Sequence, residues 1–276
     1  MKPAAFDYVR AETLDEALET LAENGDDAKI IAGGQSLMPM LNIRLVRPAV
    51  LVDISRIPDM SYIRPDQKTL EVGGTVTQGT LLADNSIAET APLLARALPH
   101  IGHFQTRNRG TVCGSLCHSD PSSEIPLCLA TIGGSVVLRS KRGERTVEAD
   151  DFQLDMLTTD CRADEIAVAA RFPTSEPRTG YAFAERARRH GDFAMVALAA
   201  VVSDKTIKLG VGGVANKPTV RRWDGLDAGD LDDALNEFAW DLGGSDDIHA
   251  TARYRRELVR RLGAQVIREA RDARIQ

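Results

Sequence analysis

The pattern of apolar and polar positions predicts a chain that mixes strands and helices from its beginning. Residues 6–10 alternate between apolar and polar types, as a short strand does. Thr13 and Glu16 have the spacing of a capping box, and an apolar helical stripe follows at positions 14, 17, 18, 21 and 22. Residues 29–32 then predict a second strand. Residues 6–32 are therefore predicted to form a strand, a helix and a second strand, in that order.

The same pattern continues through the next hundred residues. Further strands are predicted at 50–54, 69–76, 135–139, 145–148 and 165–172. The strand at 69–76 is expected to be one arm of a hairpin, and 135–139 pairs with 145–148 in another. Helical spacing occupies 77–98, with Pro92 as an interruption, and a short helix is expected at 126–132.

Residues 173–180, rich in Pro, Ser, Thr and Gly, predict a linker between a larger and a smaller domain, 1–175 and 176–276. Strands are predicted beyond it at 181–186, 194–203 and 206–211, although the alanine-rich part could also form a helix. Helices are predicted at 231–240 and 247–270. The last helix is expected to bury a stripe made of Tyr254, Leu258, Leu262 and Val266.

Two glycine-rich segments stand out from this background. The first, IIAGGQSL at 30–37, directly follows a predicted strand, and the second, RNRGTVCGSLCHSDPSSE, occupies 107–124. Backbone without side chains can bring its N–H groups against an anion, and small hydroxyls add further donors. Two such loops could hold the two ends of a diphosphate. A nucleotide cofactor is therefore the first hypothesis.

Composition and charge narrow the class of protein. The chain has 276 residues, is 43% apolar and 27% charged, and carries a net charge of −6, which argues against a general nucleic-acid binder. Basic clusters at 186–190 and 253–261 are expected to be solvated or to face a partner. No apolar run approaches the length of a membrane span, and the N-terminus has no apolar region typical of a signal peptide. A cytoplasmic location is expected.

The common catalytic patterns are missing from the sequence. It contains no G-x-G-x-x-G dinucleotide motif, no nucleoside-triphosphate loop and no nucleophile elbow. Cys113, Cys117, His118 and Cys128 lie close together, but their spacing matches no common zinc or ferredoxin pattern, so no metal site is expected. No catalytic residue can be assigned. Any redox chemistry would therefore depend on a bound cofactor.

Three segments together resemble a known family. AGGQSLMPMLNIRLVRP, RNRGTVCGSLCHSDPSSEIP and RARRHGDFAMVALAAVV are similar, in order and spacing, to the FAD-binding medium subunit of the molybdenum hydroxylases. This family includes the medium subunit of aerobic carbon monoxide dehydrogenase and the flavin domain of xanthine dehydrogenase. The resemblance implies an α+β chain. A two-subdomain FAD-binding fold of the PCMH/vanillyl-alcohol-oxidase type, split near 55–60, is followed by a smaller C-terminal α+β domain.

The resemblance also implies which residues bind FAD. Contacts with the diphosphate and adjoining groups, made largely by backbone N–H groups, are expected from Ile31, Ala32, Gly33, Gly34, Gln35, Ser36 and Leu37. The second loop is expected to contribute Thr111, Gly114, Ser115 and Asp120, and Glu124 to hydrogen-bond the sugar-alcohol chain. Phe193, within Gly-Asp-Phe-Ala, is expected near the isoalloxazine. A branched side chain at Gly34 is expected to occupy the phosphate position.

Cys113 is one of the positions that depart from the family pattern. Cys113 stands where the family usually has a glycine. Its sulfur must turn away from the cofactor, and a positive φ at this position would cost roughly 1 kcal/mol or more.

The function implied by the resemblance is that of an electron-transfer subunit. A large molybdopterin subunit would hydroxylate the substrate, and a small subunit with 2Fe-2S clusters would pass electrons through FAD on this chain to an external acceptor. A dimer of heterotrimers is the expected assembly. One alternative is a stand-alone FAD-dependent oxidase or dehydrogenase of the related flavin fold, and another is a scaffold that has lost FAD.

Overall fold

The first layer of the fold is a small parallel sheet covered by one helix. The computed structural model describes residues 2–274. Its three-stranded sheet has the order β1 (Asp7–Arg10), β3 (Val50–Asp53), β2 (Ala28–Ile31). Helix α1 (Leu14–Asn24) packs on this sheet, and the Thr13 hydroxyl accepts a hydrogen bond from the Glu16 backbone N–H at 3.2 Å. The predicted strand, helix and strand are confirmed. Helix α2 (Leu37–Asn42), which the pattern did not predict, follows β2.

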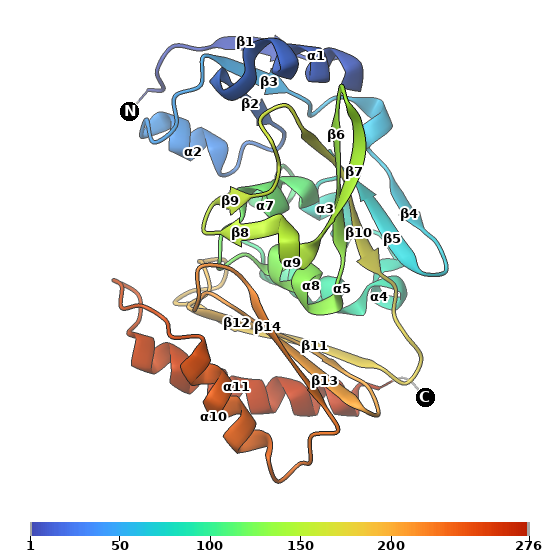
Figure 1. Cartoon of the computed structure of the whole chain (residues 1–276), viewed down its shortest axis with the longest axis vertical. Coiled ribbons are helices and arrows are strands. Elements are labelled where there is room, and N and C mark those ends of the chain that lie inside the picture. Colours follow the sequence, from blue (N-terminus) through green and yellow to red (C-terminus); the bar gives the residue numbers. More distant parts are fainter. Residues whose placement is uncertain (1, 275–276) are drawn as a thin grey trace.

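The second layer is an antiparallel sheet of five strands. Its order is β4 (Ile63–Pro65), β5 (Thr69–Gly73), β10 (Ile166–Pro173), β6 (Ser135–Ser140), β7 (Gly143–Glu148). Strands β4 and β5 form one hairpin and β6 and β7 another, so both predicted hairpins are confirmed. The first layer lies above this sheet in Figure 1, and the loop after β2 points towards it.

Short helices surround the five-stranded sheet. They are α3 (Gln78–Leu82), α4 (Ile87–Thr90), α5 (Pro92–Ala97), α6 (Phe104–Arg107), α7 (Val112–His118), α8 (Glu124–Ile132) and α9 (Ala149–Phe152). The helical spacing at 77–98 therefore becomes three separate helices, and Pro92 begins the third because proline is tolerated in a first turn. A small hairpin of β8 (Gln153–Asp155) and β9 (Thr158–Thr159) lies beside α7.

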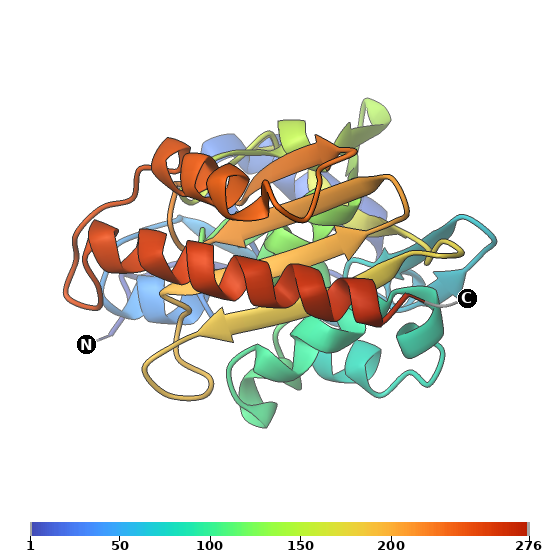
Figure 2. The same cartoon turned by 90° about the horizontal axis from the view of Figure 1, so that it is seen from below.

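The third layer is an antiparallel sheet with two helices on one face. Its strands are β11 (Gly180–Arg186), β12 (Val196–Val202), β13 (Thr206–Gly212) and β14 (Thr219–Asp224), in that order. Helices α10 (Leu231–Asp241) and α11 (Ala252–Asp272) cover the outer face, and Figure 2 shows α11 crossing the sheet. The alanine-rich part is thus strand β12, so the suggestion of a helix there was wrong. Strand β14 was not predicted.

The last helix differs from the prediction in two ways. It begins at Ala252 instead of 247, because Thr251 caps it and Asp247 accepts hydrogen bonds in the preceding turn. Its buried face is made of Arg255, Val259, Gly263, Ala264, Val266, Ile267 and Ala270. Of the predicted stripe, Val266 is buried, Leu258 and Leu262 are partly buried against the same core, and only Tyr254 is exposed, so the prediction was wrong for Tyr254. Within residues 2–274, no helix is long and apolar enough to cross a membrane.

Helix α8 joins the second and third layers. Residues 124–131 are all buried, because α8 packs against α5 and α7 on one side and against β12 and β13 on the other. A side chain at Gly210 on β13 would overlap the Thr131 hydroxyl, so the helix and strand meet closely there. One apolar cluster runs from β5 and β6 through α8 to β12. The mixed helix and sheet architecture confirms the α+β class.

Candidate cofactor site

The loop after β2 offers a row of free backbone donors. The chain leaves β2 at Ile31 and enters α2 at Leu37. Among the described residues, the N–H groups of Gly33, Gly34, Gln35 and Ser36 donate no hydrogen bond to the protein. The loop is only partly buried, so these donors remain accessible. Consecutive free N–H groups in a turn form a concave anion site.

The two glycines of this loop have different structural roles. A Cβ at Gly33 would overlap the carbonyl oxygen of Arg109. Gly34 has φ +70°, and its Cβ would lie 3.3 Å from the side chains of Ile31 and Met38. The structure therefore gives a further reason for excluding a branched residue at Gly34, besides the expected phosphate position. Its side chain would enter the loop's own apolar base, and the positive φ would be strained.

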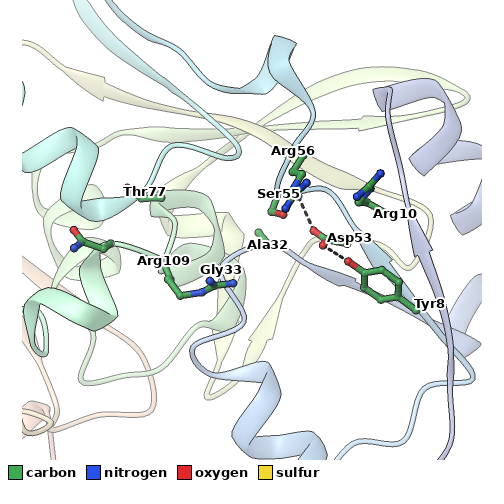
Figure 3. Close-up of a pocket in the computed structure, with 10 residues that line it drawn as sticks. Tyr8, Arg10, Ala32, Gly33, Asp53, Ser55, Arg56, Thr77 and Arg109 are labelled. Atoms are coloured by element: carbon green, nitrogen blue, oxygen red, sulfur yellow. Dashed lines mark hydrogen bonds between the residues drawn. The ribbon is translucent and has the colours of Figure 1, made fainter.

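The second glycine segment lies against the first. Because Gly33 has no side chain, its backbone reaches the backbone of Arg109 and Gly110, and Figure 3 shows Arg109 beside Gly33. The second segment is held in place by hydrogen bonds from the Val112 N–H to the Val76 carbonyl at 3.0 Å and from the Gln78 N–H to the Gly110 carbonyl at 2.8 Å. The structure therefore brings together two loops that are far apart in sequence.

Helix α7 begins directly after this contact. Thr111 is buried as its N-cap and accepts a hydrogen bond from the Gly114 N–H at 3.0 Å. Gly114 is exposed and Ser115 partly buried, so both face the surface of the loop. The Thr111 hydroxyl, by contrast, accepts a hydrogen bond within the protein and so stabilises the start of helix α7.

Cys113 lies inside helix α7 and needs no unusual backbone. It does not have a positive φ, and its side chain is buried with its Sγ 4.0 Å from the Val72 carbonyl oxygen. Burial raises the pKa of this thiol to about 12. The sulfur therefore points into the core, and the strain considered for this position is absent.

Glu124 begins helix α8 as a buried carboxyl. Its pKa is raised to about 7, mainly by burial and with a smaller contribution from the charge of the nearby Glu185, while His100 acts in the opposite direction. Among the described residues, no other residue donates a hydrogen bond to the Glu124 carboxyl, and its own backbone N–H is the one donor that lowers its pKa. Asp120 has a partner, since it accepts from the Ser122 N–H at 2.8 Å. Glu124 thus has unused hydrogen-bonding capacity.

Phe193 lies in a different cavity from the first glycine loop. Its side chain is 72% exposed, and it lines a cavity of about 710 Å³ with Arg188, Arg189, Gly191, Asp192, Met195 and His249. Gly191 has φ +85° and packs against the carbonyl of Gly102, just before the second glycine segment. The loop of Phe193 is therefore near the second segment, while the first loop lines a separate cavity.

The hairpin of β8 and β9 was missed by the sequence analysis. It exposes Leu154, Met156 and Leu157, and the Leu157 N–H donates to the Ser119 carbonyl at the end of α7 at 2.9 Å. Leu157 has φ +55°, which is unusual for a leucine. No local pattern reveals that this hairpin adjoins the second loop. Within residues 2–274, no three metal-ligating side chains cluster, and all four cysteines are free thiols.

Comparison with known proteins shows the family to which this chain belongs. Residues 4–175 match the FAD binding domain in molybdopterin dehydrogenase. The chain belongs to this family. It is 40% identical over 216 residues to caffeine dehydrogenase subunit beta of Pseudomonas sp. (strain CBB1), covering 78% of this chain and 73% of that one. It is 36% identical to the nicotine 6-hydroxylase medium subunit of Paenarthrobacter nicotinovorans, covering 98% and 99%.

Solved structures agree with the sequence relatives. Carbon monoxide dehydrogenase from Hydrogenophaga pseudoflava superposes with a TM-score of 0.92 at 30% identity, covering 100% of both chains. Quinoline 2-oxidoreductase from Pseudomonas putida 86 superposes with a TM-score of 0.92 at 33% identity, also covering 100% of both. The resemblance to the flavin-binding family of molybdenum hydroxylases is confirmed. This chain is an FAD-binding oxidoreductase subunit of that family.

The residues present fit FAD. The free N–H groups of Gly33 to Ser36 match the chemistry of a diphosphate, which needs donors and a positive local potential. The buried carboxyl of Glu124 can bond hydroxyl groups such as those of a sugar alcohol. The exposed ring of Phe193 can contact a flat aromatic group. These are three different kinds of group, and FAD contains a partner for each.

Proposed function

We propose that this chain holds the FAD of a molybdenum hydroxylase complex and carries electrons between a partner's iron–sulfur clusters and an external acceptor. The observation that supports this most strongly is the row of free N–H groups at Gly33 to Ser36, placed against the second glycine loop. Bound FAD would supply the exchange between single-electron carriers and a two-electron acceptor. The residues of this chain supply the binding and the environment.

Each part of the site has a separate task in this proposal. The backbone of the first loop, Ile31 to Leu37, holds the diphosphate, with Gly114 and Ser115 facing it from α7. Asp120 shapes the turn after α7, and Glu124 bonds hydroxyls of the sugar-alcohol chain. Phe193 covers the isoalloxazine and excludes water from one side. No residue of this chain has to act as a general acid or base.

The absorption spectrum of the purified full chain tests the cofactor assignment. We expect flavin bands that remain after gel filtration, and release of FAD instead of FMN on heating. A colourless protein that takes up no FAD in equilibrium dialysis would contradict the proposal and favour a scaffold that has lost the cofactor.

Co-purification tests the assembly. The relatives are named as subunits or medium chains of larger enzymes, including caffeine dehydrogenase and carbon monoxide dehydrogenase. We propose a large molybdopterin subunit and a small 2Fe-2S subunit as partners here, arranged as a dimer of heterotrimers. Affinity capture of this chain from its native source should yield two further chains with molybdenum and iron. A flavoprotein that turns over substrate without partner chains would favour the stand-alone oxidase or dehydrogenase.

A further inference from the structure

A cationic cleft lies where the first sheet faces the second layer. It has a volume of about 740 Å³ and lies at the carboxyl ends of β1 and β3 and the end of β2. Its lining includes Tyr8, Arg10, Asp53, Arg56 and Arg109. Figure 3 shows these side chains arranged around Asp53 and Gly33. In parallel sheets, ligands bind at the carboxyl ends of the strands, which is where this cleft opens.

The charges of the cleft are unusual for this chain. Three arginines and one carboxylate line the cleft, although the whole chain has a net charge of −6. Arg56 and Arg109 form no ion pair within residues 2–274, and Arg10 pairs at 3.1 Å with Glu12, which lies outside the lining. A cleft lined by cations concentrates anions, because its walls limit screening by water.

The single carboxylate is fixed by its neighbours. Asp53 accepts hydrogen bonds from the Tyr8 hydroxyl and, at 2.8 Å, from the Ser55 N–H. Burial opposes ionisation of Asp53, but these hydrogen bonds outweigh it and lower its pKa. Asp53 therefore remains charged, and its lone pairs can accept from sugar hydroxyls. The ring of Tyr8 is 55% exposed and offers a flat apolar surface.

The cleft overlaps the proposed FAD contacts only at two residues of the first loop. It includes Ala32 and Gly33 but no residue of α7, and neither Glu124 nor Phe193. Its other walls come from β1, the turn after β3, Thr77 at the start of α3, and the segment before Gly110. The arginines, Asp53 and Tyr8 of these walls are not among the proposed FAD contacts.

We propose that this cleft binds a phosphate-bearing small molecule, with Arg10, Arg56 and Arg109 contacting its phosphate groups. Guanidinium groups suit phosphate because their planar N–H donors match two oxygens at once. The volume lies within the range of small-molecule pockets. Asp53 and Tyr8 would contact the ribose and base if the ligand is a nucleotide.

Titration calorimetry on the flavin-loaded full chain tests this inference, with ADP and inorganic pyrophosphate as probes. We expect saturable binding of both probes at one site, weakened by added salt. Arg10→Gln and Arg56→Gln should each reduce the affinity by about tenfold, the effect of losing one charge-assisted hydrogen bond. Arg253→Gln on α11 is the matched control, because it removes the same charge from an exposed residue outside the cleft.

The flavin spectrum separates this inference from the cofactor assignment. Both arginine variants should keep the full flavin content, since neither residue lies among the proposed FAD contacts. Tighter binding of ADP than of pyrophosphate, lost in Tyr8→Ala, would identify a nucleotide, and equal affinities would identify a phosphate ligand without a base. No saturable binding, an equal loss in Arg253→Gln, or displacement of FAD by ADP would overturn the inference.

Discussion

At the scale of single residues, Gly33 and Gly34 show how adjacent identical residues can serve different purposes. Gly33 permits two backbones to touch, whereas Gly34 permits a backbone conformation that L-residues avoid. The sequence indicated a glycine loop but not this division, because the neighbour of Gly33 comes from a distant segment. Cys113 gives the opposite case. Cysteine in place of the family's glycine suggested backbone strain, but Cys113 lies inside a helix with its sulfur in the core, so this strain is absent.

Gly33→Ala should separate the two glycine loops. Its Cβ would overlap the Arg109 carbonyl, so one loop must move away from the other. We expect loss of most bound FAD and a free energy of unfolding lowered by about 2 kcal/mol, as for other overpacked sites. Flavin absorbance per chain and urea denaturation measure the two effects. Gly229→Ala is the control, since its Cβ would meet open space. Full flavin content in Gly33→Ala would contradict the proposed role of this contact.

Glu124 should make stability depend on pH. Burial raises the pKa of Glu124 to about 7, from 4.5 as the reference value. The folded chain therefore holds a proton that the unfolded chain loses, so stability falls as pH rises from about 4.5 to 7. Glu124→Gln removes this dependence. Relative to wild type, the flavin-free variant should gain about 2 kcal/mol between pH 5 and pH 8 in urea denaturation. A constant difference across this range would show that Glu124 is ionised in the folded chain.

At the scale of elements, the sequence left an alternative open for β12 and misplaced part of the buried face of α11. Strand β12 is buried on both faces, against α8 on one side and α11 on the other, so its sequence shows no alternation. The prediction for α11 assumed an apolar residue at every fourth position. Each residue turns the helix by 100°, so four residues turn it by 400°, which is more than one full turn. The predicted stripe therefore drifts around the helix, and Tyr254 ends up exposed.

Arg255 should be essential for anchoring helix α11. It is buried, and its guanidinium donates to the carbonyls of Met195 at 3.2 Å and Ser245 at 2.9 Å and to the Asp247 carboxylate at 2.8 Å. Arg255→Leu leaves these acceptors unpaired, and we expect a loss of about 3 kcal/mol in the free energy of unfolding.

Two further observations check the role of Arg255. The control is Arg253→Leu, because Arg253 is exposed. Since Met195 closely follows Phe193, limited proteolysis of the 187–195 loop should also become faster in Arg255→Leu. Equal stability of the two variants would show that α11 does not depend on this network.

At the scale of the whole molecule, the two glycine loops of the proposed cofactor site could be recognised in the sequence, while the cleft beside them could not. The glycine loops are contiguous motifs whose chemistry lies in neighbouring residues. Arg10, Arg56 and Arg109 come from three separate segments, and only the packing of the first sheet on the second layer brings them together. Local sequence patterns cannot show that these three segments come together in the fold. The exposed hairpin of β8 and β9 escaped prediction for the same reason.

The second and third layers should unfold together. Helix α8 is buried by both, and Thr131 packs directly on Gly210 of β13. We expect one calorimetric transition across these layers, with equal calorimetric and van't Hoff enthalpies. Gly210→Ala should lower its midpoint and Gly229→Ala should not. Two resolved transitions, each retained in a separate fragment, would show that α8 does not couple the layers.

The contact between Gly33 and Arg109 has a consequence for synthesis on the ribosome. The first glycine loop leaves the ribosome long before the segment that it packs against has been translated. Until Gly110 emerges, the nascent chain presents the first loop on its three-stranded sheet without the second layer that this loop packs against. In the proposed site, FAD would therefore bind only after the second segment has been translated. Translation pauses before residue 110 would prolong the exposure of this unfinished surface to chaperones and proteases.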